Sequence, residues 1–147
     1  MISAAIPVRV KYFNQPYKLK KNPKGDWYDL YTKEDITILG GQYSEIPLGI
    51  AVELPAEFEA IVAPRSSTFR KYGLLQTNGI GVIDNSYNGD NDEWTMPVLN
   101  ARKNPVTIPE GTRLCQFRII HNQPPLVFRE VETLGNTDRG GLGSTGD

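Results

Sequence analysis

The sequence predicts an all-β domain, either a sandwich or a barrel. Apolar and polar side chains alternate with a period of two along almost the whole chain, which is typical of half-buried strands. The 11 prolines and 14 glycines interrupt this alternation at short intervals, as turns do between the strands of an all-β fold. With 147 residues, the chain is long enough to bury a core without a disulfide or a structural metal ion.

The stretches with the clearest alternation are predicted to be strands. In the last of them Cys115 shares one face with Phe117, so we expect Cys115 to be a buried apolar residue and not a nucleophile. Leu114 and Gln116 are expected on the opposite face. A short strand is also expected to end just before Asp84, and another within "WYDLY". The clearest stretches are 7–13, 47–55, 58–64, 93–100 and 113–120.

One stretch, "RSSTFRKYGL", breaks the alternation and predicts a single short helix. Ser66 or Ser67 is a suitable N-cap residue, and Gly73 suits the position just past the C-terminus. The free amide groups at the start of such a helix, together with the Ser66 hydroxyl and the Arg65 guanidinium, suit a phosphate. The alternative is an ordinary capped helix beside a surface arginine.

The last thirteen residues, 135–147, form a predicted arm, which leaves 1–134 as the β domain. They contain five of the 14 glycines and one large apolar side chain, Leu142. Such a segment cannot bury enough surface to fold by itself. Two interpretations stay open: a flexible tail, or an arm that orders over an anionic ligand with Arg139 and backbone amides as donors.

Charge and rare residues exclude several classes of function. The formal net charge is -1, from 16 basic and 17 acidic residues, so we expect neither nucleic-acid binding nor membrane binding. A single cysteine excludes an intrachain disulfide and suits a cytoplasmic protein, and the N-terminus does not read as a signal peptide. A single histidine, His121, excludes a metal site with several histidines, and we expect it to be exposed or capping.

The stretch "GIGVIDNSYNGD" places one carboxylate, Asp84, directly after a short apolar run, and an aromatic residue, Tyr87, three positions later. Asp84 is either a turn-forming acid or a general base that takes a proton from water. Tyr87 offers a flat face to a sugar or a ring. Gly79 and Gly81 permit a close approach to the backbone.

Two further polar residues are weaker candidates. Asp29, in "GDWYDLY", could hold Mg²⁺ through a water molecule if its carboxylate faces a cleft. Gln116, in "EGTRLCQF", could bond a phosphate oxygen or position a metal-bound water. Each is equally well explained as an ordinary turn or strand residue.

Five stretches resemble the five motifs of the trimeric dUTPase family, both in their residues and in their order along nearly the whole chain. They are "GDWYDLYT", "APRSST", "NGIGVIDNSYNG", "EGTRLCQF" and "RGGLGSTG", of which the second, third and fifth are specific. The resemblance implies a jelly-roll-like β-barrel that assembles as a homotrimer with shared active sites. It also implies Mg²⁺-assisted hydrolysis of dUTP to dUMP and diphosphate, which keeps uracil out of DNA and supplies dUMP for thymidylate synthesis.

The resemblance further implies a role for each matching residue. Asp84 matches the acid that activates the attacking water, and Tyr87 the aromatic residue that packs on deoxyribose and leaves no room for a 2′-hydroxyl. The arm matches a segment that closes over the site, with Arg139 on the γ-phosphate and Leu142 over uracil. The remaining matches are Asn78, Gly81 and Ile83 in a hairpin that reads uracil, Arg65, Ser66, Ser67 and Gln116 around the phosphates, and Asp29 for a water on Mg²⁺.

Three departures from the family's pattern affect these expectations. The first motif has Asp26-Trp27 where the family has Ala-Gly, which changes the surroundings of Asp29. The fifth motif is shorter and carries Leu142 in place of an aromatic residue, and a leucine covers uracil but cannot stack on it. The stretch 90–93 is unusually acidic; its acids either form a solvated loop, which we expect, or perturb the nearby site.

Other functions stay open beside dUTP hydrolysis. A dCTP deaminase of the same superfamily also carries Arg-Ser-Ser, but it needs a further acid at the cytosine ring, for which Glu93 is the nearby candidate. A non-catalytic β protein would not need all the candidate residues together. A dUTPase with an additional regulatory protein partner is also compatible with the sequence, and the 90–97 loop is where we would expect that partner. So compact a chain suits a phage or bacterial member.

Overall fold

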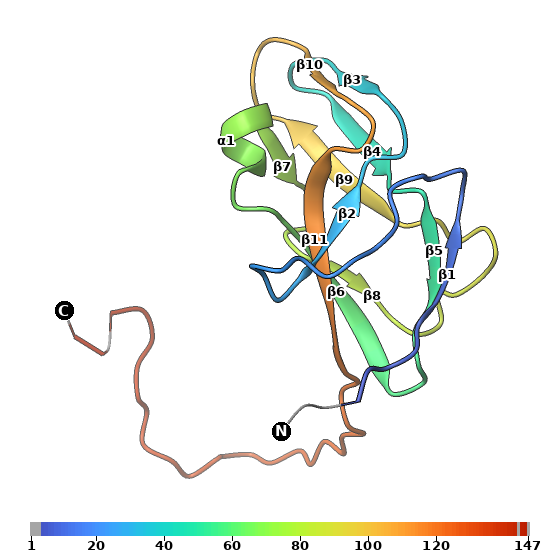
Figure 1. Cartoon of the computed structure of the whole chain (residues 1–147). Coiled ribbons are helices and arrows are strands. Elements are labelled where there is room, and N and C mark those ends of the chain that lie inside the picture. Colours follow the sequence, from blue (N-terminus) through green and yellow to red (C-terminus); the bar gives the residue numbers. More distant parts are fainter. Residues whose placement is uncertain (1–3, 144, 147) are drawn as a thin grey trace.

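The computed structural model describes residues 4–143, 145 and 146, and Figure 1 shows the course of the whole chain. Within the described residues there are eleven strands and one short helix, so the predicted all-β class is confirmed. Residues 1–3, 144 and 147, at the ends of the expected domain and arm, lie outside the described residues.

The largest sheet has four antiparallel strands and carries several of the candidate residues. Its order is β2-β11-β6-β8, so the long strand β11 pairs with β2 on one side and β6 on the other, and β8 lies at an edge. The strands are β2 (Tyr28–Tyr31), β11 (Arg113–His121), β6 (Phe58–Pro64) and β8 (Gly81–Ile83).

Seven further strands complete the domain (Figure 1). Three of them form an antiparallel sheet of order β4-β9-β7, and the other four form two antiparallel pairs, β1-β5 and β10-β3. They are β4 (Tyr43–Pro47), β9 (Thr95–Asn100), β7 (Leu74–Gln76), β1 (Arg9–Tyr12), β5 (Ile50–Glu53), β10 (Val106–Ile108) and β3 (Ile36–Ile38).

One apolar core joins strands of all these sheets. At its centre the rings of Trp94 and Phe117 meet edge to face, with 5.3 Å between their centroids. Cys115 is buried as predicted, and burial raises the pKa of its thiol, which disfavours the reactive thiolate. Leu114, expected on the outer face, is also buried, because the register of β11 with β2 shifts between Arg113 and Cys115.

The predicted helix is present as α1 (Thr68–Tyr72) and is shorter than the stretch that suggested it. Ser67 occupies the N-cap position without a side-chain capping bond, and Gly73 ends the helix in the left-handed region at φ 68°. The guanidinium of Arg102 donates hydrogen bonds to the carbonyl oxygens of the last turn, including that of Arg70 at 2.7 Å. The C-terminal end of the helix is therefore fixed by Gly73 and by the hydrogen bonds from Arg102.

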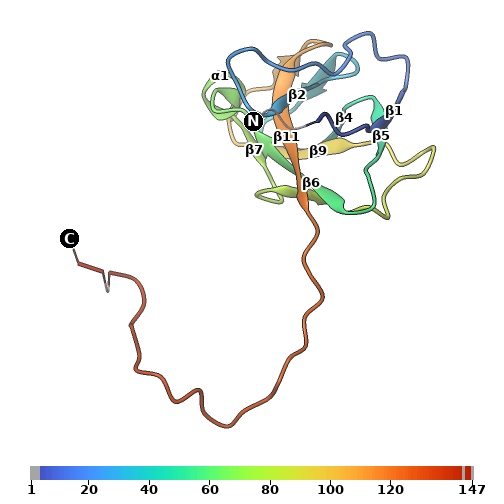
Figure 2. The same ribbon diagram turned by 60° about the horizontal axis from the view of Figure 1, so that its bottom comes forward.

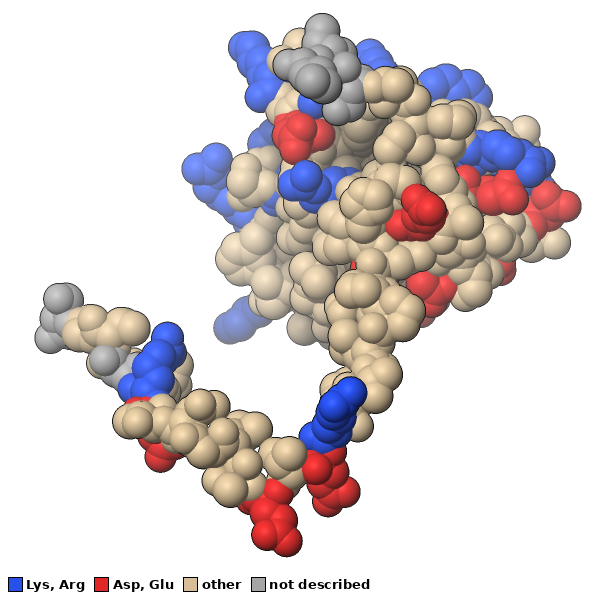
Figure 3. Space-filling model, turned by 90° about the horizontal axis from the view of Figure 1, so that it is seen from below, with Lys and Arg blue, Asp and Glu red and all other residues tan. Residues whose placement is uncertain are grey.

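The chain after β11 runs away from the sheets without regular structure, as Figures 1 and 2 show. Its described residues from 123 onward are exposed, so the extended segment begins well before residue 135. Acidic and basic side chains both occur along it, and both signs are also interspersed on the face of the domain in Figure 3. At its start His121 is exposed, as expected, and stacks on Phe58 at 4.5 Å.

Among the residues that the structure describes, none of the helices is long and apolar enough to cross a membrane.

Candidate functional site

The first group of candidate residues forms around Asp29 in β2, at one edge of the four-stranded sheet. Asp29 lies directly opposite Gln116 in the β2-β11 register, and it is only 6% exposed. Its Oδ1 is 3.1 Å from Nε of Arg65, and its Oδ2 is 3.4 Å from Nη1 of Arg113. A carboxylate so deeply placed needs such partners, because an unpaired buried charge is costly.

Arg113 is a member of this group that the sequence did not single out. It lies in the quoted stretch "EGTRLCQF", three positions before Gln116, and regular alternation would place it on the other face of the strand. The register shift after Arg113 turns its side chain to Asp29. A β-bulge of this kind has no signal in the hydrophobic pattern, so the contact was not predictable from spacing.

The turn between β6 and α1 presents the two serines beside this group. Its geometry is fixed by one carbonyl, that of Leu114, which accepts the backbone N–H of Arg65 at 3.2 Å and the hydroxyl of Thr68 at 2.6 Å. Ser66 is exposed and Ser67 is half-buried on the turn between these anchors. The structure therefore groups hydroxyls, backbone amides and two guanidiniums, which suits an anion.

Gln116 completes this first group from β11. Its Nε2 donates to the carbonyl oxygen of Pro64 at 3.3 Å, which directs the side chain toward the start of the same turn. The predicted neighbourhood of Asp29, Arg65, Ser66, Ser67 and Gln116 is thus found in one place. We refer to these residues with Arg113 as the anion group.

The second group contains Asp84, which follows β8. The backbone N–H of Ser86 donates to Asp84 Oδ1 at 2.8 Å, and the Ser86 hydroxyl bonds the same oxygen. These bonds form the Asx turn that was one of the two interpretations of this acid. The hydroxyl bond, and then the backbone bond, lower the pKa of Asp84 below its usual value, so the exposed side chain is an ionised proton acceptor.

Tyr87 lies beside Asp84 in the same hollow. Its side chain is held at the far end, because its Oη donates to the carbonyl oxygen of Glu93 at 3.1 Å. Partial burial, and then the charges of Asp92 and Glu93, raise the pKa of Tyr87, so the phenol stays neutral and a donor. The hollow has a volume of about 320 Å³ and is lined by Val82, Ile83, Asp84, Ser86, Tyr87, Glu93, Trp94 and Thr95.

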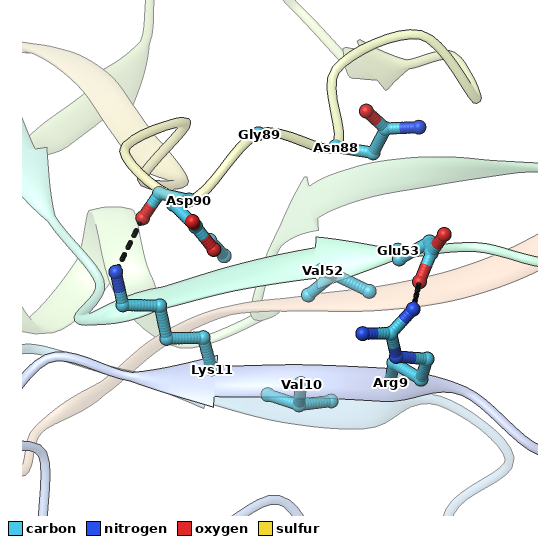
Figure 4. Close-up of a pocket in the computed structure, with 9 residues that line it drawn as sticks. Arg9, Val10, Lys11, Val52, Glu53, Asn88, Gly89 and Asp90 are labelled. Atoms are coloured by element: carbon cyan, nitrogen blue, oxygen red, sulfur yellow. Dashed lines mark hydrogen bonds and ion pairs between the residues drawn. The ribbon is translucent and has the colours of Figure 1, made fainter.

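The acidic stretch 90–93 is only partly the solvated loop that we expected, because Asp90 is exposed but Asp92 and Glu93 are half-buried. Asp92 accepts the backbone N–H of Gly89 at 2.8 Å, and Glu93 is half-buried and bonded on both carboxylate oxygens. A further hydrogen bond ties this stretch to β1: Nζ of Lys11 donates to the carbonyl oxygen of Asp90 at 2.8 Å, as Figure 4 shows. This tether spans a hollow of about 140 Å³ between β1, β5 and the loop.

The expected uracil-reading hairpin has a different construction from the one predicted. Its flanking strands lie in different sheets, because β7 pairs with β9 and β8 pairs with β6. The turn between them places Asn78 at the surface, with Gly79 at φ 69°. Gly81 lies opposite Val62, and a Cβ at Gly81 would come within 3.0 Å of the Val62 side chain. Close strand packing therefore already explains this glycine.

The two groups are well separated within one chain. Ile83 pairs with Ala60, and Gln116 pairs with Ala63, so the two residues are two strands and three positions apart. With about 3.3 Å per residue and about 4.8 Å between strands, their Cα atoms are roughly 14 Å apart. Arg139 and Leu142 are exposed on the extended segment, which Figures 1 and 2 show away from the sheets.

Within the described part of the chain, no three His, Cys, Asp or Glu residues gather as a direct metal site. Both oxygens of Asp29 already face arginines, so Asp29 suits contact with a metal ion through water better than direct ligation.

Known proteins with similar sequences are described as dUTPases. The family model for dUTPase matches residues 16–146. The chain is 46% identical over 140 residues to the SPbeta prophage-derived deoxyuridine 5'-triphosphate nucleotidohydrolase YosS of Bacillus subtilis (strain 168), across 95% of this chain and 97% of that protein. It is 39% identical over 118 residues to the deoxyuridine 5'-triphosphate nucleotidohydrolase of Finegoldia magna, across 79% of this chain and 80% of that protein.

Solved structures share the fold. The dUTPase of Staphylococcus bacteriophage 80alpha with dUPNHPP has a TM-score of 0.81 at 20% identity, across 97% of this chain and 100% of that one. A mutant dUTPase from phage phi11 of S. aureus, described as revealing the coordination of a structural Mg(II) ion, has a TM-score of 0.74 at 20% identity, across 88% and 99%. The predicted jelly-roll-like fold is confirmed by this likeness.

Proposed function

Because the chain belongs to the dUTPase family, we propose that it hydrolyses dUTP to dUMP and diphosphate. One observation of the structure carries the proposal furthest: an ionised, exposed carboxylate and a fixed aromatic ring line the same hollow. The relatives just described are named for dUTP hydrolysis, and the reaction needs a proton acceptor for water and a surface for the sugar.

Asp84 is the proposed general base. Its lowered pKa keeps the carboxylate ionised at neutral pH, and its unbonded oxygen lone pairs can accept a proton from a water molecule. The Asx turn fixes its direction before substrate arrives, so no reorganisation is needed at the moment of attack. The attacked atom is the α-phosphorus, and diphosphate leaves with the electron pair of the broken P–O bond.

The residues around Asp84 are proposed to select the sugar and the nucleobase of the substrate. The ring of Tyr87 packs on the deoxyribose and leaves no room for a 2′-hydroxyl, and Asn78 with the backbone of Gly81 and Ile83 reads the edge of uracil. A base without the matching pattern leaves buried donors and acceptors unpaired, which penalises it strongly. Leu142 of the arm covers the base, and Arg139 meets the γ-phosphate.

The anion group is proposed to bind the phosphates. Arg65, Ser66, Ser67 and Gln116 supply charge and hydrogen bonds, and Asp29 holds a water molecule of Mg²⁺. Bound with the substrate, Mg²⁺ supplies positive charge at the phosphate oxygens. The pairing of Asp29 with two arginines supports a contact through water, because neither carboxylate oxygen is free of a cation.

The separation of the two groups supports a shared site. A triphosphate held by the anion group of one chain would leave Ile83 of that chain roughly 14 Å away across the sheet, and Asp84, the next residue, farther still. We infer a homotrimer in which Asp84 and the anion group of each site come from different copies. We further infer that the 135–147 arm, which runs away from its own sheets, closes over a site whose Asp84 belongs to another copy and brings Arg139 and Leu142 to it; residues 1–134 form the β domain.

Two finer expectations accompany this proposal. We infer a cytoplasmic location, the host cytoplasm if a phage encodes the chain, from its single cysteine. The 80alpha relative is described as a phage dUTPase that controls transfer of virulence genes. A regulatory partner of this chain stays a prediction, for which the stretch 90–97 is the proposed contact; its residues 95–97 belong to β9 and are not part of a loop as expected.

The test is a substrate panel. Diphosphate release is measured from dUTP, dTTP, dCTP and UTP, with Mg²⁺ and with EDTA, and ammonia release is measured in parallel. We expect fast release from dUTP alone, and only with Mg²⁺. Ammonia from dCTP would replace the proposal with a deaminase, although both oxygens of Glu93, the candidate acid, already bond Gly49 and Lys33. No reaction with any of the four from folded protein would leave a binding protein.

A further inference from the structure

Glu93 ends the acidic stretch in an unusual environment. Its side chain is 21% exposed, and each carboxylate oxygen has its own partner. Oε2 accepts the backbone N–H of Gly49 at 3.0 Å, and Oε1 lies 3.4 Å from Nζ of Lys33. A carboxylate with this much burial and two specific donors is held in one position.

The partners of Glu93 are themselves fixed by Phe13. The ring of Phe13 lies under Nζ of Lys33 at 5.4 Å, and its backbone N–H donates to the carbonyl oxygen of Gly49 at 2.9 Å. Gly49 sits at φ 72°, where a Cβ would come within 3.0 Å of Gln15, so only glycine presents this amide without strain. Lys11, which tethers Asp90, rests on the same ring at 4.8 Å.

The other end of Glu93 holds Tyr87. The carbonyl oxygen of Glu93 accepts the Tyr87 hydroxyl at 3.1 Å, and the next residue, Trp94, is locked by backbone bonds to Ile50 at 2.8 Å and Leu48 at 2.9 Å. The side chain of Glu93 thus helps to hold in place the backbone carbonyl group to which the Tyr87 hydroxyl donates. The carbonyl oxygen that accepts the tyrosine hydroxyl is therefore restrained from two sides, by the Glu93 carboxylate and by the backbone bonds of Trp94.

We propose that Glu93, clamped by Gly49 and Lys33, is a positioning residue that fixes the Tyr87 ring and so sets how strictly the enzyme rejects a ribonucleoside triphosphate. The inference rests on the proposed function, in which Tyr87 screens the 2′ position of the sugar. It gives the acidic stretch a role without contact to substrate. A loosened ring leaves room for a 2′-hydroxyl while the base, Asp84, keeps its own Asx turn.

The experiment compares kcat/KM for dUTP and for UTP in four proteins: wild type, Glu93→Ala, Glu93→Gln and Lys33→Met. We expect Glu93→Ala to lower the dUTP/UTP ratio by about tenfold, mainly through faster UTP hydrolysis, because two charge-assisted bonds are lost. Lys33→Met keeps the Gly49 bond and should lower the ratio only about threefold. The matched control is Glu34→Gln, an exposed acid in the neighbouring turn, which should leave the ratio unchanged.

A second variant separates positioning from general stability. Tyr87→Phe removes the hydroxyl bond directly, so Glu93→Ala added to Tyr87→Phe should lower the ratio little further, whereas independent effects would multiply. If Glu93→Ala does not fold, the ratios of Glu93→Gln and Lys33→Met decide the matter. Unchanged ratios in enzymes that hydrolyse dUTP would overturn the inference. A wild type without dUTP hydrolysis would instead overturn the proposed function.

Discussion

The loop that carries Asp84 and Tyr87 and the C-terminal arm that carries Arg139 and Leu142 are opposites in construction. The loop is bonded to β1, to the β4-β5 turn and to the segment after β5, whereas the described arm residues are exposed and run away from the sheets. Both are proposed to contact the same nucleotide. Each chain therefore carries a fixed half and a free half, and in the proposed trimer each site combines the fixed half of one copy with the free half of another.

The difference follows from what each half must do. Groups that act on developing charge are most effective when they are already oriented, so the base and the sugar-facing ring are tied down before binding. A segment that covers the substrate must first let it enter, so it cannot be packed on the domain beforehand. Glycine-rich sequence supplies that freedom in the arm, and an ordering cost must then be met on closure.

The largest expected effect comes from the fixed half. Asp84→Asn keeps the shape of the side chain but removes the proton acceptor, so we expect kcat for dUTP to fall by about 10³-fold. The measurement is steady-state diphosphate release, with binding of a non-hydrolysable dUTP analogue as a check that the site is intact. The control, Glu57→Gln, alters an exposed acid outside the candidate groups and should retain wild-type activity. An active Asp84→Asn enzyme would remove Asp84 from the mechanism.

Removing the free half should reduce activity without reducing stability. A chain that ends at Leu134 loses Arg139 and Leu142 but none of the core, so we expect kcat to fall by about 10²-fold and the melting temperature to stay the same. Arg139→Gln should reproduce part of this loss. A truncated protein that melts at a lower temperature would show that the arm packs on the assembled domain and is not free.

A smaller effect, on stability, is expected from loosening the loop where it leaves β8, at Asn85. The amide of Asn85 donates to the carbonyl oxygens of Leu54 at 2.7 Å and Pro55 at 2.9 Å. Asn85→Ala removes both bonds and leaves the Pro55 oxygen with only the backbone N–H of Phe58, which should lower the free energy of unfolding by about 1–2 kcal/mol. Thermal unfolding measures it, with Asn88→Ala, at an exposed position of the same loop, as the control that should not change.

The smallest expected effect is a shift in pH dependence. The Ser86 hydroxyl is the main cause of the lowered pKa of Asp84, so Ser86→Ala should raise that pKa toward its usual value. The base is active when ionised, and the acid limb of kcat/KM for dUTP should therefore move to higher pH in Ser86→Ala. Activity at neutral pH should be nearly unchanged. A shift to lower pH, or none, would contradict the assigned cause.

Local signals in the sequence predicted much of this architecture. Alternation predicted the long strands, and the serines with Gly73 predicted the one helix, because both are set by neighbouring residues. The strand pair β3 and β10 was missed, since three residues are too few to show a period. The turn at Asn78 was predicted as a hairpin, because the sequence does not reveal that its flanking strands join different sheets.

The site was predicted in its residues more than in its contacts. The stretches around Asp84 and Asp29 were recognisable from their order along the chain. The two-arginine pairing of Asp29 depends on the register shift after Arg113, and the clamp on Glu93 joins residues 44 and 60 positions apart. Contacts of this kind are set by the tertiary fold, for which a single sequence carries no periodic signal.

The most direct test of the shared site is to combine, in one trimer, chains that lack the general base with chains that lack the arm. Asp84→Asn chains and chains that end at Leu134 are co-expressed with different tags, and mixed assemblies are purified through both tags. If the base and the arm of one site come from different copies, mixed trimers should regain about a third of wild-type dUTP hydrolysis, since one site in three receives both. Mixed trimers as inactive as their parents would show that one chain supplies both groups, and would contradict the account.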